Sequence, residues 1–245
     1  MTYRRIFFLV LFIGAARCVP TVSTKQGCSS QDSEANPSQI RNTFEVTTDS
    51  SIPDIKDKVE IKVYYETLCP FSMLFFTSQL KPAVARLGSH LDVHLIPYGH
   101  AKTNAVHDTY KFDCQHGQPE CFGNLIQACA IDVLNDTTRA VNFNTCLMRS
   151  FYRSTDYQYL VSVFYWCGYI EKVNVRKMKK CLNSKRGPIL LKEYGDETTA
   201  LQLSYVPYVL INGSEDYQDQ ASSDLIGTVC RMLRPQPAAC YRNRY

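Results

Sequence analysis

The chain has 245 residues, 45% hydrophobic and 12% aromatic, which is enough apolar material for a globular protein with one sizeable core. Its formal net charge of +4 is small and argues against a nucleic-acid partner. Eleven cysteines is a high count for this length, and it favours an oxidising compartment in which disulfides persist.

The N-terminus has the layout of a secretory signal peptide. Arg4 and Arg5 precede an apolar run from Ile6 to Ile13, and the small residues 14–16 follow. A membrane anchor needs about 20 apolar residues, so this run is too short to span a bilayer. We therefore predict a signal peptide at residues 1–18. Its removal leaves 24 basic and 23 acidic side chains, and no membrane partner is expected for the mature form.

Residues 19–57 are rich in polar residues and show no periodicity, which is typical of a flexible leader or propeptide. Two sequons, Asn135-Asp-Thr and Asn212-Gly-Ser, are candidate N-glycosylation sites. They agree with the secretory route that the signal peptide predicts.

The fold is predicted to begin with a strand over Val59–Tyr65, where apolar and polar residues alternate. Cys69 then lies where an amphipathic helix starts, and Pro70 suits the first turn because its missing N–H would be unpaired there. The free amide groups and the positive end of the helix dipole favour the thiolate form of the cysteine. Cys69 is therefore the candidate nucleophile.

Apolar residues continue at helical spacing as far as Leu87, and Pro82 is expected to kink or split this helix. Residues 91–98 read as a second strand. A strand, a helix and another strand of this length form a right-handed crossover with parallel strands. This arrangement puts Cys69 at the carboxyl edge of a sheet, where open α/β sheets bind ligands.

Residues 101–203 are predicted to be mostly helical and contain six cysteines. The aromatic cluster Phe164–Trp166, with Tyr157 and Tyr159, is interpreted as the core of this segment. The basic stretch Arg176–Arg186 is interpreted as a solvated helix face. A short strand over residues 206–211 follows, then a hairpin turn at Asn212-Gly213 and a final helix over residues 221–233.

The block from Cys114 to Cys129, CQHGQPECFGNLIQAC, resembles the pattern CQHGxxECxxNxxxxC of the gamma-interferon-inducible lysosomal thiol reductase family. The resemblance covers about residues 58–240. It implies an α/β thioredoxin-like fold with a large disulfide-stapled helical insertion at about 101–203, and a secreted or lysosomal thiol-disulfide oxidoreductase that acts on protein disulfides. It also implies that Pro207 is a cis-proline facing the thiol and that Val206 offers its backbone to substrate.

One position departs from the family pattern. Family reductases carry Cys-x-x-Cys, whereas this chain reads Cys69-Pro70-Phe71-Ser72. A serine cannot attack a mixed disulfide, so turnover requires an external small-molecule thiol as reductant, and no bound cofactor is expected. Ser72 is expected to donate a hydrogen bond to the Cys69 thiolate, and Pro70, Phe71 and Val206 are expected to contact substrate.

Cysteine counting is consistent with this reading. Cys18 leaves with the signal, Cys28 lies in the leader and Cys69 is the nucleophile, so eight remain to form four structural bridges with the pairing left open: Cys114, Cys121, Cys129, Cys146, Cys167, Cys181, Cys230 and Cys240. A zinc site of Cys114, His116, Cys121 and Cys129 has suitable ligand types, but its spacing matches no common zinc module. We therefore expect no metal, and a hydrogen-bonded structural role for His116.

Two alternatives remain open. The chain could be a catalytically impaired family member that acts as a secreted binding module and holds partners through one mixed disulfide at Cys69. It could also be a purely structural cysteine-rich protein. A free thiol at a helix start is a liability in a secreted protein unless it is used, which favours the first two readings.

Overall fold

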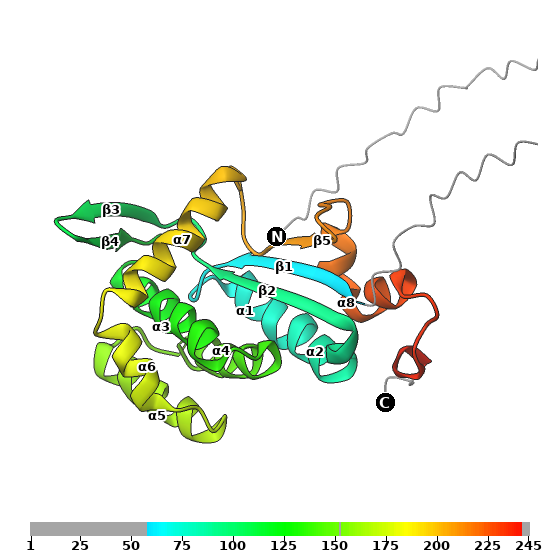
Figure 1. Cartoon of the computed structure of the whole chain (residues 1–245), viewed down its shortest axis with the longest axis horizontal. Coiled ribbons are helices and arrows are strands. Elements are labelled where there is room, and N and C mark those ends of the chain that lie inside the picture. Colours follow the sequence, from blue (N-terminus) through cyan, green and yellow to red (C-terminus); the bar gives the residue numbers. More distant parts are fainter. Residues whose placement is uncertain (1–57, 152, 242–245) are drawn as a thin grey trace, which may run out of the picture. The chain divides into compact units, whose positions relative to one another are not determined.

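The computed structural model describes residues 58–151 and 153–241 (Figure 1). The predicted signal peptide, the leader and Cys28 lie outside the described residues. The centre of the fold is a three-stranded sheet in the order β2-β1-β5. Strand β1 (Val59–Tyr65) pairs in parallel with β2 (Leu91–Pro97) and antiparallel with β5 (Tyr208–Ile211). The predicted strand and parallel crossover are confirmed.

The register of the strands brings three chain segments to one edge of the sheet. Tyr65 pairs with Pro97 at the carboxyl ends of β1 and β2, and Tyr64 pairs with Tyr208 at the start of β5. The loop after β1 and the segment before β5 therefore meet at this edge. The sequence between them is more than 130 residues long, so only the folded sheet brings them together.

The first helix is divided into pieces. Helix α1 (Pro70–Phe75) runs into a π-helical turn (Phe76–Leu80), then α2 (Lys81–Leu87) and a short 3-10 turn (Gly88–His90). Pro82 lies in the first turn of α2, where its missing N–H needs no carbonyl partner. The predicted split is confirmed, and it takes the form of a wider π turn.

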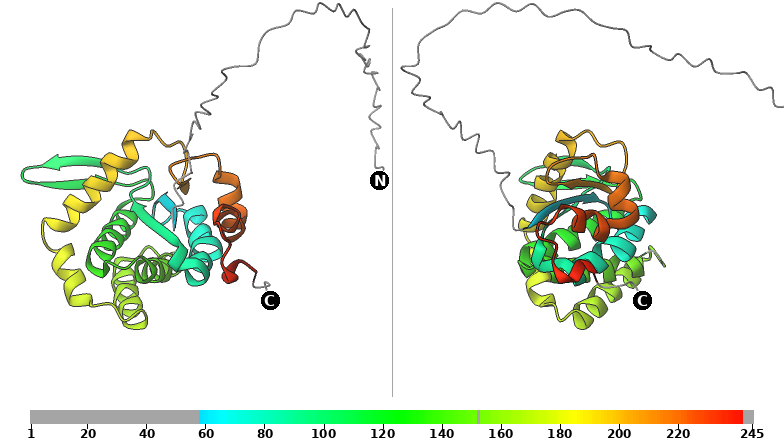
Figure 2. Two further views of the ribbon diagram at one scale, coloured as in Figure 1. Left: turned by 45° about the vertical axis from the view of Figure 1, so that its right-hand side comes forward. Right: turned by 90° about the vertical axis from the view of Figure 1, so that its right-hand side faces the viewer.

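Helices cover both faces of the sheet (Figure 2). On one face α1, α2 and α8 (Gln218–Met232) pack on apolar strand residues such as Ile61 and Val63. On the other face lies α7 (Arg186–Ala200), where Glu197 accepts hydrogen bonds from Tyr64 Oη at 2.8 Å and Lys62 Nζ at 3.3 Å. Among the described residues no helix is both long and apolar enough to cross a membrane.

The helical segment between β2 and β5 has an apolar core of its own. Its helices are α3 (Gln118–Leu134), α4 (Thr137–Phe151), α5 (Tyr157–Ile170) and α6 (Val175–Leu182). Fully buried side chains from all four meet in this core, among them Ile126, Phe143, Leu160 and Met178. Disulfides Cys129–Cys181 and Cys146–Cys167 join α3 to α6 and α4 to α5, which fixes the helices around it.

The start of this segment is a correction to the sequence analysis. Residues 102–113 form a β-hairpin, β3 (Lys102–Val106) and β4 (Thr109–Asp113), where mostly helical structure was predicted. The turn is His107-Asp108, with His107 at φ 53°, so it lacks the glycine that usually marks such turns. Phe112 is buried against Tyr98, and this tertiary contact fixes the hairpin on the body of the protein.

The end of the sheet also differs from prediction. Strand β5 begins at Tyr208, so Val206 and Pro207 precede the strand. Asn212 and Gly213 do form a turn with positive φ, but one bridge between Ile211 and Ser214 replaces a returning strand. The chain passes instead into α8 and a 3-10 turn (Ala238–Tyr241), which Cys230–Cys240 ties back to α8.

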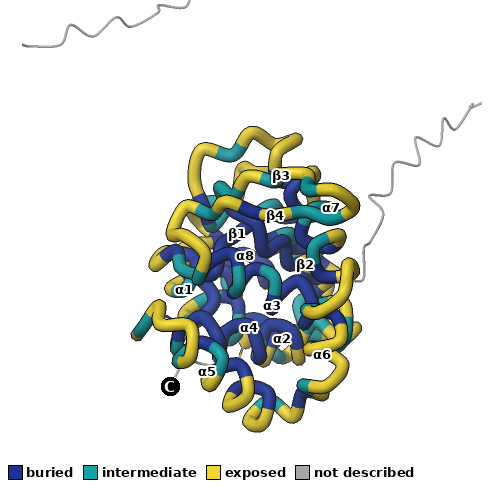
Figure 3. Tube along the Cα trace, turned by 90° about the vertical axis from the view of Figure 1, so that its left-hand side faces the viewer, coloured by how far each residue is buried: buried dark blue, intermediate teal, exposed yellow. Residues whose placement is uncertain are grey.

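The aromatic cluster is mostly on the surface, contrary to its interpretation as core. Phe164 is buried, but Tyr157, Tyr165 and Trp166 are 59%, 45% and 53% exposed. Helix α5 packs on α4 through one face only, and its outer positions are exposed in Figure 3. Sequence could not separate the two faces because both are rich in apolar and aromatic residues.

Candidate active site

The candidate nucleophile lies at the junction of β1 and α1. Cys69 is the residue before the first helical residue, with extended backbone angles of φ −66° and ψ 121°. Its carbonyl accepts the first helical hydrogen bond, from Met73 N at 3.0 Å. The side chain therefore sits beside the unpaired amide groups of the first turn, as predicted from the sequence.

Cys69 carries the one free thiol among the described residues. It is 7% exposed, and its sulfur lies 3.6 Å from the carbonyl oxygen of Val206, to which the thiol can donate a hydrogen bond. The Val206-Pro207 peptide bond is cis. The thiol, the Val206 carbonyl and the cis-proline thus form one site at the sheet edge, as expected from the family resemblance.

Ser72 lies one helical turn after Cys69 and is completely buried. Its hydroxyl has no hydrogen-bond partner among the described residues, so the predicted bond to Cys69 is not formed in this state. The neighbouring Phe71 is 71% exposed and Pro70 is also exposed. The rim of the site is therefore apolar and open, while Ser72 holds a buried, unpaired hydroxyl one turn into the helix.

The loop that carries Cys69 is held by α3. Asn124 Oδ1 accepts hydrogen bonds from Thr67 N at 2.9 Å and Thr67 Oγ1 at 2.6 Å, and its Nδ2 donates to Tyr98 O at 3.3 Å. Glu120 Oε2 accepts from Leu68 N at 3.3 Å. One face of α3 thus binds the residues just before the nucleophile and the end of β2 together.

A glycine allows α3 to approach this closely. A Cβ atom added to Gly123 would lie 2.6 Å from Thr67 Cγ2, well inside van der Waals contact. The sequence analysis found the motif but assigned no role to Glu120, Gly123 or Asn124. Glu120 and Asn124 occupy fixed positions of the pattern, which was the signal, whereas Gly123 occupies a variable position and gave none. In the structure all three position the loop of the nucleophile.

Two buried carboxyl groups and a histidine lie behind this loop. His116 Nδ1 is 2.7 Å from Glu120 Oε2 and 3.5 Å from Glu66 Oε1, and His100 N donates to Glu66 Oε2 at 3.0 Å. Burial raises the pKa of Glu66 to about 7, and the nearby Glu120 charge adds to the shift, while the His100 amide and His116 oppose it. Glu66 thus holds its proton to a higher pH than an exposed carboxyl group.

The metal hypotheses can be tested against this geometry. Cys114, Cys121 and Cys129 are all in disulfides, so the Cys3His zinc site is not available. Glu66, His116 and Glu120 place ligand atoms within 4.8 Å of one another. Their carboxylate oxygens already accept hydrogen bonds from backbone amides, so support of the loop accounts for the cluster.

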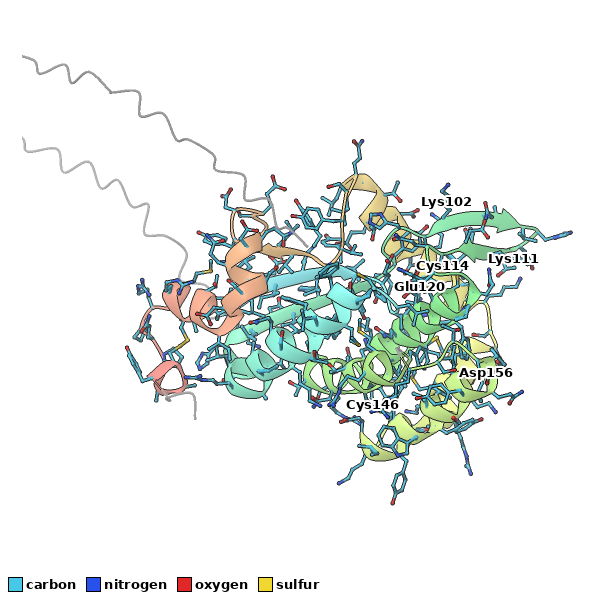
Figure 4. All side chains as sticks on the ribbon, turned by 180° about the vertical axis from the view of Figure 1, so that it is seen from behind. Lys102, Lys111, Cys114, Glu120, Cys146 and Asp156 are labelled. Carbon is cyan, nitrogen blue, oxygen red and sulfur yellow. A yellow bond between two sulfur atoms is a disulfide. The ribbon has the colours of Figure 1, made fainter. Side chains whose placement is uncertain are left out.

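The remaining predicted residues have clear positions. The eight expected cysteines form four bridges, Cys114–Cys121, Cys129–Cys181, Cys146–Cys167 and Cys230–Cys240, as predicted. Figure 4 labels Cys114 and Glu120 near the base of the hairpin, on the same end of α3. Asn135 is exposed at the end of α3, and Asn212 is exposed but accepts a hydrogen bond from Glu60 N. Glycosylation at both stays a prediction.

Comparison with known proteins finds a family model and several relatives that match this chain. The family model of gamma interferon inducible lysosomal thiol reductase (GILT) matches residues 60–167. The gamma-interferon-inducible lysosomal thiol reductase of Carassius auratus is 30% identical and covers 96% of this chain and 91% of its own. GILT-like protein 1 of Drosophila melanogaster is 33% identical over 75% of this chain and 78% of its own. A thioredoxin-like oxidoreductase from Silicibacter pomeroyi superposes with a TM-score of 0.43 and 8% identity, covering 68% of this chain and 85% of that chain.

In this structure a strand leads to a cysteine at a helix start, and a cis-proline that precedes an antiparallel strand lies opposite the cysteine. This arrangement defines a thioredoxin-like thiol-disulfide oxidoreductase. The motif from Cys114 to Cys129, most of which lies on α3, identifies one family within this class. With relatives at 30% identity or more over most of its length, the chain belongs to the gamma-interferon-inducible lysosomal thiol reductase family.

The role of Asn124 gives a first prediction. Asn124→Ala removes three hydrogen bonds at a fully buried position and leaves Thr67 N and Tyr98 O unpaired, so the free energy of unfolding should fall by about 3 kcal/mol. Urea unfolding measures this, and alkylation of Cys69 in the folded protein should become faster as its loop loosens. Asn104→Ala, at an exposed hairpin position with one hydrogen bond, is the control and should change stability by less than about 0.5 kcal/mol. Equal effects of the two variants would contradict the proposed role.

Glu66 gives a prediction on pH. The unfolded carboxyl loses its proton near its ordinary pKa of 4.5, whereas the folded one keeps it to about 7. The contribution of Glu66 to stability is therefore greatest at acidic pH, and about 3 kcal/mol is lost as the pH rises from about 4.5 through about 7. Glu66→Gln imitates the protonated acid and keeps the acceptor for His100 N, so the difference in unfolding free energy between about pH 5 and about pH 7.5 should shrink by about 2 kcal/mol, the part of the loss that falls in this interval. The exposed Glu193→Gln is the control, and a wild-type pH dependence in Glu66→Gln would refute the prediction.

Proposed function

We propose that this protein is a secreted or lysosomal oxidoreductase that acts on disulfides of other proteins through the single nucleophile Cys69, with an external small-molecule thiol as resolving agent. The observation that carries the proposal is the pairing of a free Cys69 thiol with the Val206 carbonyl and cis-Pro207, while residue 72 is a buried serine. The site holds one sulfur where a dithiol reductase has two.

The reaction balances without a bound cofactor. The Cys69 thiolate attacks a substrate disulfide, forms a mixed disulfide and releases one substrate thiolate. One external thiol attacks the Cys69 sulfur and releases the second substrate thiol, and a second external thiol then regenerates Cys69 as the oxidised external disulfide leaves. The net change is that one substrate disulfide is reduced and two external thiols are oxidised.

Each remaining site residue has a proposed role. A side chain one turn into a helix can reach back to the residue before the helix, so we expect the unpaired Ser72 hydroxyl to donate a hydrogen bond to the Cys69 thiolate once the thiolate forms. Val206 and Pro207 present backbone to an extended substrate segment. The exposed Phe71 and Pro70 contact the apolar residues beside the substrate disulfide.

Three observations support a secretory destination. They are the signal-like N-terminus, the four disulfides and the similarity to relatives named lysosomal thiol reductases. The raised pKa of Glu66 adds to them, because this carboxyl group contributes most to stability at acidic pH.

The second candidate function is a binding module that forms one mixed disulfide and does not turn over. The buried, unpaired Ser72 hydroxyl favours it, since no internal group can resolve a trapped partner. The two candidates share the first chemical step and differ in the second.

Restoring the second sulfur separates the two candidates. Ser72→Cys should raise reduction of insulin disulfides at least about tenfold over wild type, because an internal thiol at high effective concentration replaces a bimolecular step. Turbidity of the released insulin chains measures the activity. Ser72→Ala is the matched control and should stay at or below wild type. A folded Ser72→Cys protein that forms the Cys-x-x-Cys disulfide yet remains inactive would establish the binding module instead.

The external-thiol step predicts how the wild-type rate responds to reductant. Disulfide reduction should increase in proportion to the concentration of glutathione, and Cys69→Ala should abolish it. Without glutathione, mass spectrometry should detect one protein molecule linked to one substrate chain through Cys69. A rate independent of glutathione would contradict the monothiol cycle.

A further inference from the structure

The outer face of α5 carries a group of large side chains that nothing in the described structure covers. Tyr165, Trp166, Tyr169 and Ile170 are 45%, 53%, 84% and 46% exposed. Their spacing in the helix places them on adjacent turns of one face, opposite the buried residues Leu160, Val163, Phe164 and Cys167. We call these four residues the aromatic face. An exposed group of this size marks an interaction site more often than a single surface residue does.

Cations border the aromatic face on two sides. On one side Lys179 of α6 lies over the Tyr165 ring, with its Nζ 5.8 Å from the ring centroid. On the other side a cavity of about 610 Å³ lies between α4, α5 and the start of α2. Trp166 and Ile170 line it together with Lys81, Arg149 and Arg153, and its one acidic lining residue is Glu171. Those three cations form no ion pair with any other described residue.

The charge of this region differs sharply from that of the whole protein. Residues 157–180 contain five basic side chains and one acidic one, whereas the whole chain has 27 basic and 23 acidic residues. The basic residues of α6 are all exposed: Arg176, Lys177, Lys179 and Lys180. An excess of unpaired positive charge beside exposed Trp and Tyr side chains complements a negatively charged surface with an apolar layer beneath it.

We propose that the aromatic face and its bordering cations dock the protein on an anionic lipid membrane. Tyr and Trp rings are amphipathic and favour the headgroup region, where Ile170 and the ring edges can enter the acyl boundary. Lys81, Arg149, Arg153 and Lys179 then face lipid phosphates and carboxylates. Docking of this kind needs no membrane-spanning segment. A protein that lacks a long apolar run can therefore still bind a membrane surface, contrary to the expectation from the sequence.

A membrane fits the surface better than a polyanion in solution. Nucleic-acid surfaces intersperse cations among stacking rings along a groove, whereas here the rings and Ile170 occupy one helix face and the cations lie at its borders. This separation is that of an interfacial amphipathic surface. The face lies on α5, which packs on α4, and the thiol site lies at the sheet edge, so the inference does not depend on the redox chemistry.

The chain contains one tryptophan, and Trp166 is therefore a specific optical probe of this face. The mature secreted protein is mixed with phosphatidylcholine vesicles containing about 30 mol% phosphatidylserine, and with phosphatidylcholine vesicles alone. With the anionic vesicles, the Trp166 emission should shift to shorter wavelength and the protein should sediment with the lipid. Binding should weaken at least tenfold without phosphatidylserine, and also as salt rises from about 0.1 M to about 0.5 M.

Matched variants locate the docking surface. Tyr169→Ser should lower the vesicle partition constant about tenfold, and Lys179→Gln or Arg153→Gln about fivefold each. The controls are Tyr241→Ser, an aromatic residue 67% exposed near the C-terminus, and Lys102→Gln, an exposed lysine on β3 that does not line the cavity beside the aromatic face. Both should bind like wild type. Tyr169→Ser should also leave the reaction of Cys69 with disulfides unchanged.

Several outcomes would overturn the proposal. One is the absence of any emission shift or sedimentation with anionic vesicles while circular dichroism reports a folded protein. Another is equal binding by Tyr169→Ser and wild type. Release from vesicles by millimolar inorganic phosphate would assign the cations to a free anion, and Trp166 quenching by a single-stranded oligonucleotide without vesicle binding would assign the face to nucleic acid. A dimer that Tyr169→Ser dissociates would assign it to a second copy of the chain.

Discussion

The hydrogen bonds of Asn124 hold the active end of this protein together. One amide side chain on α3 binds the loop after β1 through Thr67 and the end of β2 through Tyr98. The strand ends themselves are joined by the sheet, where Tyr98 N donates to Tyr65 O at 2.9 Å, but the loop that follows β1 lies beyond this pairing and needs contacts of its own. Here α3 supplies them, and Glu120 extends the contact to Leu68, the residue before the nucleophile. The position of Cys69 thus depends on a helix that begins nearly fifty residues later in the chain.

The disulfides stabilise the same part of the structure. Cys114–Cys121 closes the loop that leads into α3, and the pairs Cys129–Cys181 and Cys146–Cys167 tie together the helices that support it. With every other described cysteine bridged, one sulfur remains available for exchange. In the proposed mechanism Ser72 leaves the resolving step to an external thiol, because its hydroxyl can donate a hydrogen bond but cannot form a disulfide.

The helical segment has two faces with different tasks. Its inner face supports the thiol loop and encloses an apolar core. Its outer face carries exposed rings, bordered by cations that form no ion pair with any described residue. A helix needs only one apolar face to pack on the core of the protein. When a second face is also apolar, that face stays exposed and can contact a surface outside the protein. The thiol chemistry and the membrane surface can therefore be changed independently of each other.

The sequence by itself determined the strand before Cys69, the helix start, the split at Pro82, the parallel crossover and the count of bridged cysteines. Each of these follows from local periodicity, from the chemistry of one residue, or from the even number of cysteines that remain to pair. The motif between Cys114 and Cys129 identified the family, and with it the cis peptide at Pro207. The hairpin at 102–113, the disulfide pairing, the roles of Glu120 and Asn124, and the exposed face of α5 were decided by the tertiary structure alone. They depend on which surfaces meet across long separations in the chain. Neither the glycine-free turn at His107 nor the uniformly apolar sequence of α5 carries that information locally.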